Sequence, residues 1–413
     1  MKVEKPRGTR DFAPDEMWAR TLVERKMSCA IENYGYRRVS VPTFERSELF
    51  RLKSGEEIAQ HMYVFEDKGG RELCLRPEAT ASVCRMFAEE LRAYQKPVKV
   101  YYSGPMFRYE EPQKGRYREF WQIGVELIGP SGPESDAEVI EVAARSLKSM
   151  GLKFELEVGH LGILRGLMQD LKVKEEVQDD VISAIDRGQK DKAEKLVKDK
   201  VFFDLVELKG DKKIIKKAEK ILKDYENASK ALGEFKGILS YLDALEVDYS
   251  INLGIARGLE YYTGMVFEIR VEGLGAQNQI CGGGRYDNLV ELFSGLSVPA
   301  VGFAFGFDRV VEAVKEQGIE IPKKKIDLVV APVSDEVREE AMKIASRFRG
   351  NCSVEVDLMN RKLGKILEYA SRINARYTII VGPKELEKGL VVLRDMKSGT
   401  QKEIGLNEIE RIF

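Results

Sequence analysis

Hydrophobic residues recur at helical spacing near the start of the chain. A three- and four-residue spacing predicts an amphipathic helix over residues 14–34, and its members are Trp18, Leu22, Val23, Met27, Ala30, Ile31 and Tyr34. Gly35 is expected to end that helix. The stretch Arg37–Val41 then predicts a short strand closed by Pro42.

Two longer apolar segments, 98–110 and 119–128, predict antiparallel strands joined by a polar turn over 111–118. Alternation along the second strand places two sets of side chains on opposite faces. One face carries Phe120, Gln122, Gly124 and Glu126, and the other carries Trp121, Ile123, Val125 and Leu127. A polar set in front of an apolar back predicts the floor of a ligand site. The alternative is an edge strand with its polar side in water.

Composition changes from about residue 171 to 235, where lysine, glutamate and aspartate dominate. Ile214, Ala218, Ile221 and Leu222 keep helical spacing, so the stretch predicts a helical insertion. Its lysines have two interpretations. They form an ordinary solvated helix face, or they contact a phosphate backbone.

The last ninety residues alternate between strand and helix patterns after a lysine-rich linker at 318–325. Strands are expected at 326–331, 353–358, 377–381 and 390–394, and helices at 335–348 and 361–374. The alternation predicts a small α/β module with a largely parallel sheet. The module lacks G-x-G-x-x-G and Walker sequences, which disfavours nucleotide binding there.

Length and composition narrow the class of protein. A chain of 413 residues favours two or three domains. Its formal net charge of −1 means that any nucleic-acid surface is a local patch. The five cysteines form no C-x-x-C pair, and we find no secretory signal or membrane-length apolar run. These features predict a cytoplasmic enzyme without a membrane segment.

The chain has two histidines, His61 and His160, and neither belongs to a nucleophile motif. Triads of the Ser-His-Asp or Cys-His kind are therefore disfavoured. Arginines and carboxylates are the better candidates for chemistry. Residues 257–264 join Arg257 to Tyr261, Tyr262 and Gly264, and residues 281–287 carry a triple glycine. Such a set lets backbone and cation approach a small polar ligand closely.

Several guanidiniums surround the predicted hairpin, including Arg108, Arg116 and Arg118. Arginine grips phosphate oxygens in bidentate fashion, and Phe120 can stack on a base. The sequence Phe107–Glu110 leading to Phe120 resembles motif 2 of the class II aminoacyl-tRNA synthetases. Residues 302–309 resemble motif 3, and the helix and strand before Pro42 occupy the place of motif 1.

Four further segments are similar to histidyl-tRNA synthetases: residues 6–12, 75–78, 257–264 and 282–287. The resemblance implies an α+β catalytic domain whose antiparallel sheet is flanked by helices. It also implies a helical insertion and a small α/β anticodon-binding domain. We assign residues 1–170 and 236–322 to the catalytic domain, 171–235 to the insertion and 323–413 to the anticodon-binding domain.

The same resemblance assigns roles to individual residues. Glu78 and Thr80 would bind the α-amino group of histidine, and Gln122 would orient it. Glu126 and Tyr262 would hold the imidazole nitrogens, with Tyr261 shaping the pocket. The ATP set is Arg108 on the α-phosphate, Arg116 and Arg309 on the distal phosphates, Tyr117 and Phe120 around adenine, and Glu110. Arg257 would be catalytic, together with Arg108, between the histidine carboxylate and the α-phosphate.

The implied reaction joins L-histidine to ATP, with Mg²⁺ bound to the nucleotide and no resident metal site. It then transfers histidine to the 3′ end of tRNA(His) on a homodimeric enzyme. The substrate carboxylate is already ionised at neutral pH, so no protein base is required. Fixed arginines would stabilise the charge on phosphate.

The sequence departs from the family pattern at Ala79, Glu111, Glu260, Asn288 and Asp308. The shorter Asp308 puts the orienting partner of Arg309 in question. Two other functions would share much of the architecture. One is a regulatory histidine-binding paralogue of ATP phosphoribosyltransferase, and the other is a different class II synthetase. The segments around Arg257 and the C-terminal module disfavour the first, and the tyrosine pair and triple glycine disfavour the second.

Overall fold

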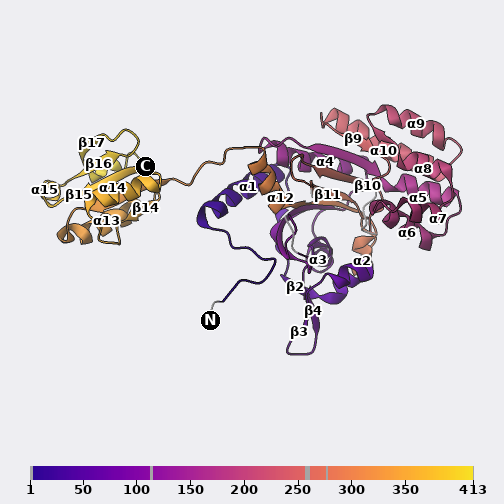
Figure 1. The fold of residues 1–413 in the computed structure, drawn as a ribbon, viewed down its shortest axis with the longest axis horizontal. Helices are drawn as coiled ribbons and strands as arrows, with labels where there is room; N and C mark the ends of the chain where they lie inside the picture. The colour runs from indigo at the N-terminus through magenta and orange to yellow at the C-terminus, as the bar shows by residue number, and fades with distance from the viewer. Residues whose placement is uncertain (1–2, 112–114, 256–260, 276–277, 413) are drawn as a thin grey trace. The chain divides into compact units, whose positions relative to one another are not determined.

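The computed structural model describes residues 3–111, 115–255, 261–275 and 278–412 (Figure 1). The chain divides into two compact units. The first comprises Met1–Phe12 and Arg20–Glu320, and the second comprises Ala13–Ala19 and Ile321–Phe413. Each unit is described by itself.

The first unit is built on a large sheet that has nine strands within the described residues, in the order β1-β5-β6-β12-β11-β10-β7-β9-β8. The strands are β1 (Arg37–Arg38), β5 (Val98–Phe107), β6 (Glu119–Ile128), β7 (Glu155–His160), β8 (Lys209–Gly210), β9 (Ser250–Asn252), β10 (Met265–Arg270), β11 (Gln279–Arg285) and β12 (Ala300–Gly306). Pairing from β5 to β7 is antiparallel throughout, whereas β1 and β9 join in parallel. The predicted antiparallel sheet is thus confirmed.

Helices flank this sheet, as predicted. They are α1 (Pro14–Glu32), α3 (Thr80–Met86), α4 (Pro133–Lys148), α11 (Leu289–Ser294) and α12 (Phe307–Glu316). The first of them buries Val23, Met27 and Ile31 at the spacing read from the sequence. Pro133 stands in the first turn of α4, together with two acidic residues, which suits a helix N-terminus.

A smaller antiparallel sheet lies in the same unit, in the order β2-β4-β3. Its strands are β2 (Phe44–Arg46), β3 (Val64–Glu66) and β4 (Glu72–Leu75), with α2 (Ser47–Gln60) packed nearby. Cys74 faces a small apolar cluster with Leu49 and Phe50. The opposite face carries Phe44 and Phe65, which are 54% and 41% exposed.

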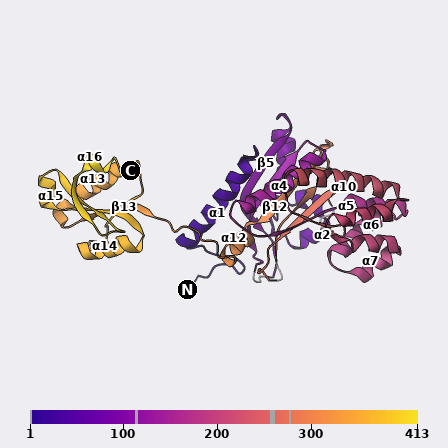
Figure 2. The same ribbon diagram turned by 90° about the horizontal axis from the view of Figure 1, so that it is seen from above.

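The lysine-rich region is helical, as predicted. It contains α6 (Glu175–Asp186), α7 (Lys190–Leu196), α8 (Lys200–Val206), α9 (Lys213–Leu222) and the first half of α10 (Glu226–Ala244), and α5 (Leu161–Asp170) directly precedes it. Figure 2 shows these helices gathered at one end of the first unit, where α10 packs against both α5 and α4. The apolar positions of α9 are buried at Ile214, Ile215, Ala218 and Leu222.

The second unit holds a sheet of five strands within the described residues, in the order β14-β13-β15-β16-β17. Its elements are β13 (Ile326–Pro332), α13 (Arg338–Phe348), β14 (Val354–Val356), α14 (Leu363–Arg372), β15 (Ala375–Val381), α15 (Pro383–Glu387), β16 (Leu390–Asp395), β17 (Gln401–Gly405) and α16 (Leu406–Ile409). β13 pairs in parallel with β14 and β15, and the last two strands are antiparallel. The small α/β module is confirmed.

Several predicted boundaries differ from the structure. The strand expected over 37–41 is limited to Arg37–Arg38, because Pro42 follows closely and lacks a ladder donor. β17 was missed because Gln401, Lys402 and Glu403 show no apolar alternation.

The predicted division into catalytic, insertion and anticodon-binding domains stays a prediction at the level of its boundaries. Among the described residues, no helix is both long enough and apolar enough to span a bilayer.

Candidate active site

The centre of the large sheet presents one continuous floor. Glu126 on β6 stands opposite Gly302 on β12, which in turn stands opposite Gly284 on β11. Two residues before Glu126 on the same strand, Gly124 pairs with Ala304 on β12 and with Tyr102 on β5. Directly paired residues of antiparallel strands share a face, so small residues surround a single carboxylate. Glu126 is only 1% exposed.

The glycines of this floor make room for larger side chains. A Cβ on Gly302 would overlap the Glu126 carboxylate, and one on Gly124 would overlap the Tyr102 ring. A Cβ on Gly284 would lie 2.8 Å from the Tyr262 ring. The triple glycine read from the sequence therefore allows close approach of strands and side chains, rather than an unusual turn.

Two tyrosines surround the Glu126 carboxylate. The Tyr286 hydroxyl donates a hydrogen bond to Glu126 Oε2. Burial, and then the nearby charge of Glu126, raises the pKa of Tyr286 well above its ordinary value. The same two causes raise the pKa of Tyr102. Both phenols therefore stay protonated at neutral pH, and Tyr286 serves as a fixed donor.

The residues assigned to histidine come together around this floor. Tyr262 is 5% exposed, and the Tyr261 ring lies 4.6 Å from it and 6.0 Å from the Tyr286 ring. Glu78 accepts hydrogen bonds from the backbone N–H groups of Thr80, at 2.6 Å, and Ala81.

The carboxylate of Glu78 thus caps the first turn of α3. Tyr102 has both Glu78 and Thr80 among its charged and polar neighbours, which links this cap to the floor. Gln122 lies further along β6, and its buried Oε1 has no hydrogen-bond partner among the described residues. A buried amide oxygen without a partner is costly unless a ligand satisfies it.

A cavity of about 230 Å³ opens beside the hairpin between β5 and β6. Its lining includes all six residues assigned to ATP from the sequence: Arg108, Glu110, Arg116, Tyr117, Phe120 and Arg309. Gly115, Trp121, Gly306 and Asp308 complete it. Three guanidiniums and three aromatic residues around one cavity suit a polyphosphate joined to a planar base.

Each arginine of this cavity is held in a different way. Arg108 Nε donates to the carbonyl of Pro77 at 3.0 Å, and its guanidinium lies 5.2 Å from the centre of the Phe120 ring. Arg116 lies 3.7 Å from Glu110, with half of its side chain exposed. Arg309 is 7% exposed and donates to the Leu274 carbonyl and to Glu312.

Two of the departures from the family pattern, Asp308 and Glu111, have visible partners. Asp308 does not orient Arg309, which pairs with Glu312. Asp308 instead accepts from Arg10 and Arg20, at 2.8 and 2.6 Å, and from the backbone N–H of Trp121. Glu111 pairs with Arg7 at 3.1 Å on the surface.

Two arginines in the family-like segments have structural partners. Arg285, next to the triple glycine, pairs with buried Asp136 and also bonds Asp287 and Ser135. Burial raises the pKa of the Asp136 carboxyl to about 6, which leaves it ionised at neutral pH. Arg76 of the Leu-Arg-Pro-Glu segment donates to the carbonyls of Val41, Pro42 and Pro105.

Arg257, the residue assigned to catalysis, lies outside the described residues, as does Glu260. Its role stays a prediction. Sequence reasoning missed Tyr286 and Tyr102 as members of the site. Tyr286 directly follows the glycine-rich strand, and Tyr102 precedes the motif 2 arginine by six positions. No periodicity in the sequence shows that both meet Glu126, because the three residues lie on different strands or beyond them.

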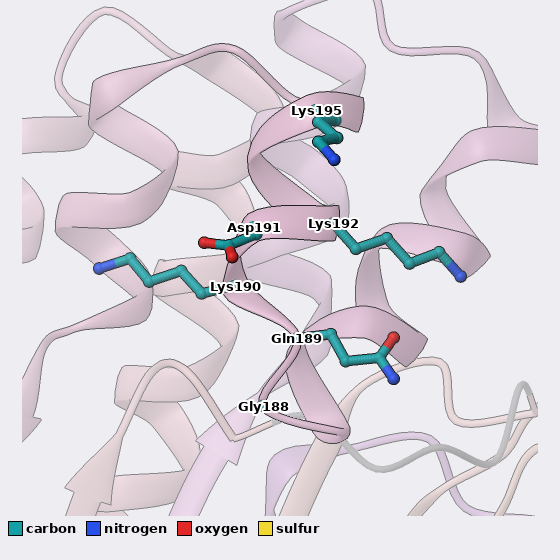
Figure 3. Close-up of a pocket in the computed structure, with 6 residues that line it drawn as sticks. All are labelled: Gly188, Gln189, Lys190, Asp191, Lys192 and Lys195. Atoms are coloured by element: carbon teal, nitrogen blue, oxygen red, sulfur yellow. The ribbon is translucent and has the colours of Figure 1, made fainter.

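A second hollow, of about 430 Å³, lies at the turn between α6 and α7 (Figure 3). Its lining is Gly188, Gln189, Lys190, Asp191, Lys192 and Lys195. In Figure 3 the side chains of Lys190 and Lys192 extend to opposite sides. Lys190 pairs with Glu207, and Lys212, just before α9, pairs with Asp243. These pairs fit the solvated-face interpretation of the lysines, and contact with a phosphate backbone stays a prediction.

The antiparallel sheet, the flanking helices and the arginine-lined cavity beside the hairpin define a class II aminoacyl-tRNA synthetase. A family model described as histidyl-tRNA synthetase matches residues 8–310, and one described as anticodon binding domain matches residues 327–413. The chain belongs to the histidyl-tRNA synthetase family.

Curated relatives match over the whole length. A histidine–tRNA ligase of Archaeoglobus fulgidus is 46% identical and covers 100% of both chains. One of Methanocaldococcus jannaschii is 44% identical and covers 98% of each chain.

Solved structures agree with the sequence comparison. Apo histidyl-tRNA synthetase of S. aureus is 28% identical over 100% of both chains, with a TM-score of 0.74. The synthetase of Nostoc sp. is 25% identical over the same share, with a TM-score of 0.82. A protein of Bacillus halodurans C, titled as an ATP phosphoribosyltransferase regulatory subunit/histidyl-tRNA synthetase, is 27% identical and covers 92% of this chain, with a TM-score of 0.79.

Proposed function

We propose that the floor around Glu126 binds L-histidine and that the cavity beside the hairpin binds ATP. The chain is a histidine–tRNA ligase by its family, and it joins histidine to its tRNA at the expense of ATP. The observation that carries the site assignment is the gathering of all six ATP candidates around one cavity. The roles of the individual residues are our proposal.

The proposed first step joins the histidine carboxylate to the α-phosphorus of ATP and releases pyrophosphate. The carboxylate is already an anion and acts as the nucleophile. Arg108 would face the α-phosphate, and Arg116 and Arg309 the distal phosphates, so that positive charge lies where negative charge develops. Arg257 would bridge carboxylate and α-phosphate. Mg²⁺ would enter with ATP and be held chiefly by phosphate oxygens, as this ion commonly is.

The second step transfers the histidyl group to the 3′ end of tRNA(His) and releases AMP. The anticodon-binding module at residues 327–413 would contact the distant end of the same tRNA. A cytoplasmic location follows from this role in translation and is part of the proposal.

Selection of histidine would depend on the fixed geometry around Glu126. Tyr286 donates a hydrogen bond to Oε2 of the carboxylate, which favours one orientation of the carboxylate. One imidazole N–H would donate to this carboxylate, and Tyr262 would contact the other ring nitrogen. Both nitrogens of the imidazole ring would then have a partner. An amino acid without an N–H in that place would leave a buried charge poorly solvated.

We also propose that the enzyme is a homodimer formed through the motif 1 region and the small sheet that follows it in the chain. β1 is an edge strand of the large sheet. On the small sheet, Phe44 pairs with Leu75 and Phe65 pairs with Leu73, which places all four on one face. An exposed apolar sheet face commonly marks an interface, and a second copy would cover it.

The test is ATP–pyrophosphate exchange with each amino acid, measured for the wild-type protein and for Arg309→Gln. We expect exchange with histidine alone and a fall of about 100-fold in kcat/KM for ATP in the variant. Arg145→Gln is the control, because Arg145 is exposed on α4. Histidine binding without exchange would instead support the regulatory-subunit function, and exchange with another amino acid would contradict the histidine assignment.

A further inference from the structure

The N-terminal segment Pro6–Phe12 lies against the hairpin that lines the nucleotide cavity. The backbone N–H of Arg118 donates to the carbonyl of Gly8 at 2.9 Å. Gly8 has a φ of +86°, and a Cβ there would lie 2.7 Å from Arg118 Cγ. Only glycine meets both conditions without strain. The segment is therefore held on the hairpin arm that follows Tyr117.

Arg10 connects this segment to the cavity wall. Its guanidinium carbon lies 3.4 Å from the centre of the Tyr117 ring, and Tyr117 lines the cavity. Its Nη2 lies 2.8 Å from Asp308 Oδ1, on α12. About a quarter of the Arg10 side chain is exposed, whereas Asp308 is 8% exposed. Arg10 itself is not among the lining residues.

Asp308 connects Arg10 to α12, on which Asp308 lies, and through its other contacts to α1 and β6. It also accepts from Arg20 on α1, at 2.6 Å, and from the backbone N–H of Trp121 on β6. The carboxylate thus has little freedom to move away from Arg10. Because two guanidiniums share one carboxylate, Arg10 does not form a bidentate pair, and its buried Nε has no hydrogen-bond partner within the described part of the chain. The Arg10 guanidinium carbon also lies 5.0 Å from the centre of the Phe12 ring, so the shorter stacking contact with Tyr117 is the one that chiefly sets the guanidinium plane.

We infer that Arg10 is a positioning residue for ATP, which acts by holding the Tyr117 ring in the cavity wall while Asp308 anchors Arg10. The inference rests on the proposed nucleotide site. A cation held over an aromatic face is worth more when it is partly desolvated, as it is here. Without Arg10 the Tyr117 ring is free to rotate, and the nucleotide loses one wall of its site.

The experiment measures KM and kcat for ATP, and KM for histidine, by pyrophosphate exchange on the full chain. For Arg10→Gln we expect KM for ATP to rise about tenfold, with kcat and KM for histidine within about twofold. Arg10→Lys keeps the charge at Asp308 but loses planar stacking, and it should fall between wild type and Arg10→Gln. Arg7→Gln is the matched control, because the Arg7–Glu111 pair is largely exposed and should change KM little.

A double variant shows whether Arg10 acts through Tyr117. Arg10→Gln combined with Tyr117→Leu should raise KM for ATP no further than Tyr117→Leu alone. If the two effects multiply, or if Arg10→Gln lowers only the melting temperature, Arg10 does not position Tyr117. If Tyr117→Leu leaves KM for ATP unchanged, the nucleotide site itself is wrongly assigned, and the inference fails with it.

Discussion

At the scale of single residues, the proposed selectivity for histidine depends on one buried carboxylate. Glu126 is held by Tyr286 and surrounded by glycines on neighbouring strands. We predict that Glu126→Gln weakens histidine binding by about 100-fold, the effect of losing a charged hydrogen bond in a buried site. Titration calorimetry with histidine measures this change.

The control for that variant is Glu138→Gln on α4, where the carboxylate pairs with Lys99 away from the floor. It should lower stability without a change in histidine affinity. The affinity of Glu126→Gln for ATP should stay within about twofold of wild type. Equal losses for both substrates would mean that Glu126 supports the fold rather than the imidazole.

The second residue-scale prediction concerns His160, which is buried on β7. Burial, followed by the charge of Arg285, lowers its pKa to about 4. Its unfolded pKa is about 6.5, so between these values the unfolded chain binds more protons. Stability due to this group is therefore present above pH 6.5 and is lost as the pH falls toward 4. We expect a loss of about 2 kcal/mol between pH 7 and pH 5.

Denaturant unfolding at the two pH values measures this loss. His160→Gln should reduce the pH dependence by that amount. The other histidine, His61, is exposed on the surface, and His61→Gln controls for the removal of a histidine outside the core. An unchanged slope in the His160 variant would refute the assignment.

At the scale of elements, the close contact of β6, β12 and β11 is the feature that shapes the floor. Gly302→Ala would place a methyl group on the Glu126 carboxylate. We predict that it lowers histidine-dependent exchange by at least tenfold and destabilises the protein by about 1–3 kcal/mol through overpacking. Exchange kinetics and thermal unfolding measure the two effects.

Gly233→Ala on α10 is the comparison for that variant. A Cβ at position 233 would meet no atom within 4 Å, and alanine favours a helix interior over glycine by up to about 1 kcal/mol. It should leave exchange unchanged and raise stability slightly. Normal exchange by Gly302→Ala would show that the floor tolerates a larger residue and that the proposed fit is wrong.

Much of this arrangement could be predicted from the sequence. Alternation along β6 correctly placed Glu126 on a polar face and Val125 on an apolar one, because strand periodicity is a local property. The partners of these residues could not be predicted that way. Tyr286 reaches Glu126 from 160 positions away, and Asp308 meets Arg20 across 288 positions. Such contacts are set by strand order, which no local pattern encodes.

The structural partners of arginine were also beyond sequence reasoning. The motif match places an acidic residue that would orient Arg309 at position 308, where this chain has the shorter Asp308. In the structure Arg309 instead forms its ion pair with Glu312, one helical turn further along. A spacing of three on a helix makes this pair possible. The motif match did not point to Glu312, because the matched residues 302–309 end at Arg309.

At the scale of the whole molecule, the proposed dimer places the exposed apolar face of the small sheet at the interface between two copies of the chain. Phe44 is 54% exposed and shares its face with Phe65. We predict that wild-type protein sediments with twice the mass of one chain and that Phe44→Glu shifts it toward a monomer, because the variant buries a charge at an apolar interface. Analytical ultracentrifugation measures the shift.

The exposed Tyr241 on α10 offers a control surface, since it is 45% exposed and lies in the helical region. Tyr241→Glu should keep the dimer mass. A wild-type protein that is monomeric and fully active would contradict the proposed dimer.

A crystal structure with L-histidine and a non-hydrolysable ATP analogue tests the central claim most directly, because it places both substrates at once. We predict the imidazole against Glu126 and Tyr262, the base beside Phe120, and the phosphates among Arg108, Arg116 and Arg309. A nucleotide bound outside the cavity, or a histidine that makes no contact with Glu126, would contradict the account.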